Sequence, residues 1–203
     1  MFTEISDLIA VLSRSGVLKN PDVVDAFSNF ARAMGDTEYR SHMLGELSVN
    51  LALNGEYDRA EQLVRMVEST DKCEFLRRIA ELEKRANDDA RASRLFSEAV
   101  AAVSLHRFPT QQALALAEIA RSLSEGASYA AADQVWQSAI QLATKAQRAS
   151  GTDGPEAAGV LVNAVQALSK LGKIEMAKSV ADSITFPELR ERAHRALSEA
   201  GRS

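Results

Sequence analysis

The histidines that could hold a metal are scattered along the chain. None of His42, His106 and His194 belongs to a His-Glu-x-x-His zinc motif. Glu191 and His194 have the Glu-x-x-His spacing of half a di-iron ligand set, but that site needs two such motifs and the sequence has no second copy. We therefore expect Glu191 and His194 to be exposed helix residues, and we predict no metal site and no cofactor.

Two side chains could serve as nucleophiles. Ser128 lies in Gly126-Ala127-Ser128-Tyr129-Ala130, close to the hydrolase motif G-x-S-x-G. That motif needs a preceding strand, whereas a helical pattern precedes Ser128, so we expect Ser128 to cap a helix. Cys73 is the single cysteine, which excludes an intramolecular disulfide and a multi-thiolate zinc site. We expect Cys73 to be a small structural side chain and predict that the protein is not an enzyme.

Composition and charge favour a helical, cytoplasmic protein. The chain of 203 residues has only ten glycines and four prolines, and its formal net charge is -4. This charge gives no general attraction to nucleic acid or to an anionic membrane, so neither is predicted as a partner. The N-terminal stretch carries Glu4 and Asp7 where a secretory signal needs basic residues, and no segment has 18 uninterrupted apolar residues.

Apolar periodicity predicts about eleven helices, paired into hairpins. Ile5, Leu8, Ile9 and Leu12, for example, recur at helical spacing before the Ser15-Gly16 break. Asp71 with Glu74 indicates a capping box, Thr110 a further helix start, and residues 151–155 a loop. The approximate hairpins are 3–34, 37–70, 72–104, 110–148 and 155–184, followed by a polar capping helix over 187–200.

Four of these hairpins share a register. The four hairpins are aligned on a small residue early in the second helix of each. The small residues are Ala60, Ala92, Ala132 and Ala177; twelve positions earlier stand Ser48, Ala80, Ala120 and Val165; sixteen earlier stand Leu44, Leu76, Leu116 and Leu161; and the turns hold Gly55, Asn87, Ala127 and Gly172. Over roughly residues 39–183 this pattern resembles the tetratricopeptide repeat, in which small residues lie where two helices cross closely.

The spacing of the units departs from that family. The aligned alanines are 32, 40 and 45 residues apart, against 34 in the family, and leucine replaces its tryptophan. An array of the HEAT or armadillo kind therefore remains an alternative. In either case we expect an all-α fold, a single domain over 1–203 that forms an α-solenoid of about five antiparallel hairpins plus the capping helix.

The resemblance implies a concave groove lined by the first helix of each hairpin. We expect a protein or peptide of unknown identity to bind there, which makes the chain a non-catalytic scaffold. The alternative is a ligand- or peptide-sensing regulator whose curvature changes on binding. The groove candidates are Arg77, Glu81, Lys84, Arg121, Glu125, Val162 and Gln166. Glu-to-Arg pairs four residues apart, such as Glu74 with Arg78, are expected to line the exposed helix faces.

Two further regions are secondary candidates for binding. The longer connections lie on one edge of a solenoid, where insertions often serve binding, and they contain Arg107 and Phe108. In the N-terminal hairpin, Phe2, Val11, Val17 and Leu18 lie outside the main apolar stripe. They either pack on the next hairpin or support weak self-association. Phe96 and Trp136 occupy equivalent positions, and we expect them in the core.

Overall fold

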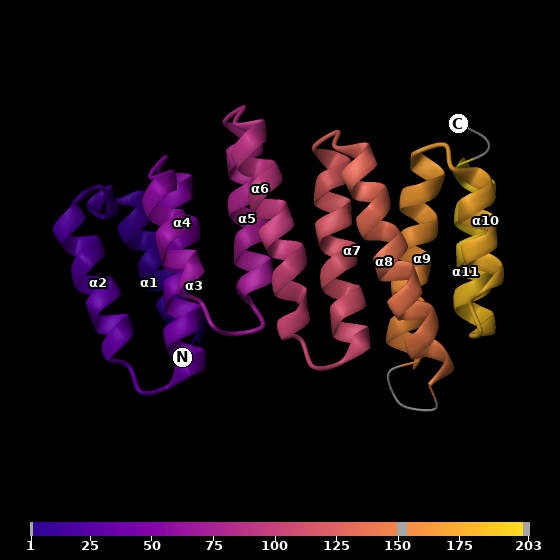
Figure 1. The fold of residues 1–203 in the computed structure, drawn as a ribbon, viewed down its shortest axis with the longest axis horizontal. Helices are drawn as coiled ribbons and strands as arrows, with labels where there is room; N and C mark the ends of the chain where they lie inside the picture. The colour runs from indigo at the N-terminus through magenta and orange to yellow at the C-terminus, as the bar shows by residue number, and fades with distance from the viewer. Residues whose placement is uncertain (1, 150–153, 201–203) are drawn as a thin grey trace. The chain divides into compact units, whose positions relative to one another are not determined.

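The described residues, 2–149 and 154–200 of a computed structural model, form eleven α-helices and two short 3-10 turns, with no strand among them (Figure 1). The helices are α1 (Phe2–Arg14), α2 (Pro21–Ala33), α3 (Thr37–Leu53), α4 (Tyr57–Arg65), α5 (Lys72–Arg85), α6 (Asp89–Ala102), α7 (Pro109–Glu125), α8 (Tyr129–Arg148), α9 (Gly154–Lys170), α10 (Ile174–Asp182) and α11 (Pro187–Ala200); the 3-10 turns are η1 (Val17–Lys19) and η2 (Val103–Leu105). The all-α class expected from the sequence is confirmed. Within this part of the chain, no helix is both long enough and apolar enough to cross a membrane.

The chain divides into two compact units, residues 1–105 and 106–203. From the sequence we expected one domain over 1–203. The boundary falls where the first of the two longer connections begins, just before Arg107 and Phe108.

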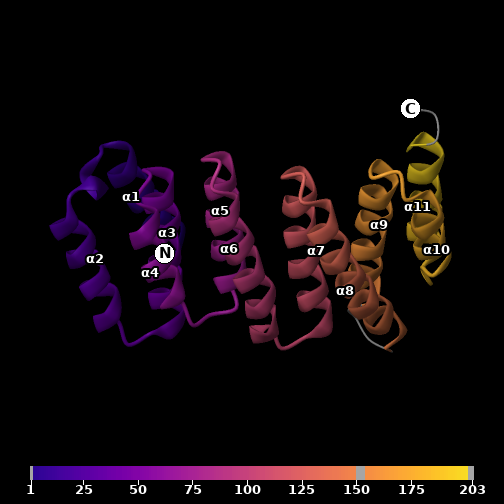
Figure 2. The same cartoon turned by 45° about the horizontal axis from the view of Figure 1, so that its top comes forward.

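In the first unit, the first helix of each pair packs on the first helix of the next. α3 contacts both α1 and α5, and α4 and α6 pack on α3 and α5, respectively (Figure 1 and Figure 2). Two hydrogen bonds join α1 to the α3 segment. Ser6 Oγ lies 3.0 Å from His42 Nε2, and Asn54 Nδ2 donates to Ser13 Oγ at 2.7 Å. Since both residue numbers rise together, α1 and α3 run parallel.

In the second unit, α9 is the central helix. It packs against α7, α8, α10 and α11, and ten of its seventeen residues are buried. The Gln147 side chain joins the end of α8 to the connection before α11, because its Nε2 donates to Ser183 O at 2.8 Å and its Oε1 accepts from Thr185 N at 3.2 Å. α11 buries Ala193 and exposes most of its charged side chains.

The same turn closes four helix pairs, α3–α4, α5–α6, α7–α8 and α9–α10. Each aligned turn residue is left-handed: φ is 83° at Gly55, 64° at Asn87, 59° at Ala127 and 72° at Gly172. In each turn the amide after this residue donates to a carbonyl five residues back, at 2.9 to 3.0 Å; Glu56 N to Leu51 O is one example. This is the Schellman arrangement, which satisfies the free carbonyls at a helix end.

The aligned core positions are buried as expected. Each of the twelve small and large residues in the shared register is at most 5% exposed. Phe96 and Trp136 also lie in the core, at 6% and 2% exposure. The register therefore describes how each helix pair packs, whichever repeat family it resembles.

Several local expectations differ from the structure at helix starts. Asp71 has helical φ and ψ angles and makes no capping hydrogen bond, so the capping box with Glu74 does not form. Ser128 precedes α8 without a side-chain cap. Phe108 rather than Thr110 precedes α7, because Pro109 already supplies the first helical position. Gly154 and Pro155 belong to α9, and residues 151–153 of the expected loop lie outside the described residues.

The N-terminal helices expose part of their expected apolar faces. Leu8 and Val11 on α1 are 51% and 53% exposed, and Phe30 on α2 is 61% exposed. Leu18 is fully buried and Val17 is 38% exposed, while the Phe2 side chain lies outside the described part. α2 instead buries Val24, Ser28 and Ala31, because it packs on α3 and η1.

Candidate functional site

The first candidate surface is a charged triad on α5. Arg77 lies between Glu74 and Glu81, with its Nη2 2.7 Å from Glu74 Oε1 and its Nη1 hydrogen-bonded to Glu81. The Arg77 side chain is only 10% exposed, because both carboxylates and the helix enclose it. Glu74 therefore pairs at i+3 with Arg77, whereas the sequence predicted Arg78 at i+4. Arg78 contacts Glu46 on α3 at 3.0 Å.

The same spacing recurs on α7. Arg121 Nη2 lies 2.7 Å from Glu118 Oε2, and its Nη1 lies 2.8 Å from Glu125 Oε1. The hydrogen bond that Arg121 donates to Glu118, followed by the one that it donates to Glu125, raises the pKa of Arg121. All three side chains are about half exposed. Glu118, Arg121 and Glu125 thus form an accessible triad with the positions i, i+3 and i+7 that Glu74, Arg77 and Glu81 have on α5.

The other sequence-predicted site residues are not part of these triads. Lys84 pairs with Asp89 at the start of α6, at 2.7 Å. Val162 is 1% exposed and lies in the core, because α9 is packed on several sides. Gln166 is half-buried on α9. Arg107 and Phe108 are both exposed just before α7, with Phe108 at 51%.

A second ionic cluster joins α4, α5 and α6. It was not predicted from the sequence. Its centre is Glu61, which is 5% exposed and accepts hydrogen bonds from Arg65 at 2.8 Å and from Arg94 at 2.6 Å. The pairing of Glu61 with Arg65 at i+4 was expected, but Arg94 lies 33 residues away in the sequence. No local spacing could reveal that partner.

Glu83 is the most deeply buried carboxylate of this cluster. It is 1% exposed, and its Oε1 lies 3.8 Å from Arg91 Nη1, which is too far for a hydrogen bond. Burial raises the pKa of Glu83; Arg91 opposes this shift, and the nearby acids Asp88, Glu61 and Asp58 add to it. Folding therefore disfavours the charged form of Glu83.

We expect the Glu83→Gln variant to be at least as stable as the unmodified protein at pH 7. A raised folded-state pKa contributes stability that is present below the unfolded pKa and is lost as pH rises through the folded pKa. Glutamine stays neutral, so its advantage at pH 7 should shrink as the pH falls below about 4, where Glu83 is protonated in both states. Urea denaturation at pH 7 and pH 4 measures both differences. A variant that is less stable at pH 7 would contradict this description of Glu83.

The groups that could do chemistry remain separate. Cys73 is buried, its Sγ lies 3.4 Å from Thr70 O, and burial raises the pKa of its thiol to about 11. His194 lies 3.2 Å from Asp182 and joins α11 to α10 rather than pairing with Glu191. Within residues 2–149 and 154–200, no three His, Cys, Asp or Glu side chains are grouped as metal ligands.

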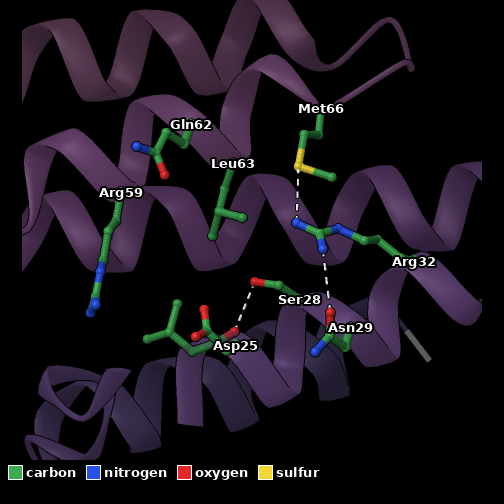
Figure 3. Close-up of a pocket in the computed structure, with 9 residues that line it drawn as sticks. Asp25, Ser28, Asn29, Arg32, Arg59, Gln62, Leu63 and Met66 are labelled. Atoms are coloured by element: carbon green, nitrogen blue, oxygen red, sulfur yellow. Dashed lines mark hydrogen bonds between the residues drawn. The ribbon is translucent and has the colours of Figure 1, made fainter. Parts of the chain in front are cut away.

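A pocket of about 360 Å³ lies between α2 and α4 in the first unit (Figure 3). Its floor contains Val24 and Leu63, which are 3% and 6% exposed. Arg59 extends from α4 at one end of the pocket, and Arg32 extends from α2 toward Met66 at the other. The sequence did not indicate this site, because the pattern of α2 gave no sign that α2 would stand away from α4.

No family model and no curated protein matches this sequence, so the molecular function rests on the chemistry of these surfaces.

Proposed function

We propose that the protein is a non-catalytic scaffold that binds a protein or peptide through the first helices of its helix pairs. The observation that carries the proposal is the repeated Glu-x-x-Arg-x-x-x-Glu triad on α5 and α7. In each triad two carboxylates surround one guanidinium, which leaves a net charge of -1. Each triad lies on the first helix of its own helix pair, and the exposed triad on α7 is a surface that a polypeptide partner can contact.

The triad on α7 has the capacity to accept further hydrogen bonds. A carboxylate has about four acceptor positions. Arg121 donates to Glu118 through Nε and Nη2 and to Glu125 through Nη1. The ion pairs hold both carboxylates in place while their remaining lone pairs face solvent. Backbone amides or basic side chains of a partner would complement this surface.

The test is affinity purification with quantitative mass spectrometry, using the Glu118→Gln/Glu125→Gln variant. We expect proteins captured by the unmodified chain to be lost or reduced about tenfold, because two charge-assisted contacts are removed. The matched control is Glu156→Gln/Glu175→Gln, which removes the same charge from exposed positions on α9 and α10. Circular dichroism establishes that each variant keeps its helices. Equal capture by both variants would contradict a role for α7.

A further inference from the structure

We infer that the pocket between α2 and α4 binds an acidic segment of a polypeptide, with its carboxylates facing Arg59 and Arg32. This inference concerns a different surface from the triads on α5 and α7. It does not require those triads to bind anything.

The two arginines of the pocket have no anionic partner among the described residues. Most arginines of this unit form an ion pair, including Arg40, Arg65 and Arg94. Arg59 makes no hydrogen bond or ion pair with any described residue. Arg32 contacts only neutral groups, Asn29 Oδ1 at 3.3 Å and Met66 Sδ at 3.8 Å. Both guanidinium groups therefore retain donors for an external anion.

The pocket is long enough to separate the two arginines. Asp25 and Arg32 mark its two ends on α2, and Arg59 and Met66 mark them on α4 (Figure 3). Seven residues of helix span about 10 Å, so the two cations lie at opposite ends of a site about two turns long. One small carboxylate can neutralise only one of them. A chain that carries two acidic side chains can reach both.

The floor and the rim of the pocket differ in exposure. Val24, Ser28 and Leu63 are each at most 6% exposed, and the Ser28 hydroxyl is already satisfied by Val24 O at 2.8 Å. The floor is therefore already covered by the protein, and the groups left for a ligand are the polar side chains of the rim. The volume lies at the lower end of the range for ligand sites, about 300 to 1,000 Å³. Asp25 on the rim is the one carboxylate that would repel an acidic ligand.

The experiment is a nitrogen-15 NMR titration of the full chain with three probes. The first is a short capped peptide with two glutamates around a leucine, the second is the same peptide with glutamines, and the third is free glutarate. We expect the acidic peptide to shift the Nε signals of Arg32 and Arg59 and to bind at least tenfold more tightly than the glutamine peptide. Binding of glutarate as tight as that of the peptide would replace a polypeptide with a small dicarboxylate and overturn the inference.

Variants of the pocket should act in opposite directions. Arg32→Gln and Arg59→Gln should each weaken the acidic peptide about five- to tenfold. Asp25→Asn should strengthen it about two- to fivefold by removing a like charge. The matched control is Arg85→Gln, which removes one positive charge from the exposed end of α5, outside the pocket. Equal weakening by Arg85→Gln would mean general electrostatic attraction, and no shift with any probe would mean that both arginines are only solvated; either result overturns the inference.

Discussion

Replacing Gly45 by alanine is expected to destabilise the first unit by about 1–2 kcal/mol. A methyl group on Gly45 in α3 would overlap the ring of Phe75 on α5, which is 3% exposed. Overpacking of this kind costs about 1–3 kcal/mol. The higher helix propensity of alanine returns about 0.5–1 kcal/mol, so the overlap dominates. Urea denaturation followed by circular dichroism measures the loss.

Two further variants separate crowding from other effects of this substitution. Gly159 in α9 has no atom within 4 Å of an added methyl group, so Gly159→Ala should stabilise the protein by about 0.5–1 kcal/mol. Leucine at position 75 removes the ring, and the double variant Gly45→Ala/Phe75→Leu should be less destabilised than the sum of its single changes by more than about 0.5 kcal/mol. Additive losses would mean that the ring is not the cause.

Replacing Ala127 by glycine is expected to stabilise the second unit by about 0.5–1 kcal/mol. Ala127 holds the left-handed turn position that Gly55 and Gly172 occupy in other helix pairs, with φ of 59°. This conformation costs a residue with a Cβ about 1–2 kcal/mol. Glycine removes that cost but increases the entropy of the unfolded chain, which offsets about 0.4–1 kcal/mol. Urea denaturation again gives the net change.

The reciprocal change provides the control. Gly172 also has a left-handed φ, of 72°, and an added methyl group would have no neighbour within 4 Å. Gly172→Ala should therefore destabilise the protein by about 0.5–1 kcal/mol through backbone strain alone. If Ala127→Gly lowers stability while Gly172→Ala raises it, the left-handed conformation would not disfavour alanine at these turns, and the strain argument would be wrong.

The charged residues show why ion pairs are difficult to predict from spacing. Residues at i+3 and i+4 are both within reach on a helix. Glu74 could pair with Arg77 or Arg78, and the choice depends on Glu46, which lies on another helix and pairs with Arg78. Arg94 likewise reaches Glu61 across two helices. Only the packing of α3, α4, α5 and α6 decides these pairs.

The local features of this protein follow from its sequence alone. Helical periodicity located the helices, and the shared register identified both the buried positions and the turn residues Gly55, Asn87, Ala127 and Gly172, because these depend on backbone conformation within one helix pair. Which helix faces remain open depends on how the helices pack on one another. Val162 is buried because α9 is packed on several sides, and the pocket with Arg32 and Arg59 exists because α2 packs on α3 and stands away from α4. Burial and pockets depend on neighbours that are distant in sequence, and no spacing within one helix encodes them.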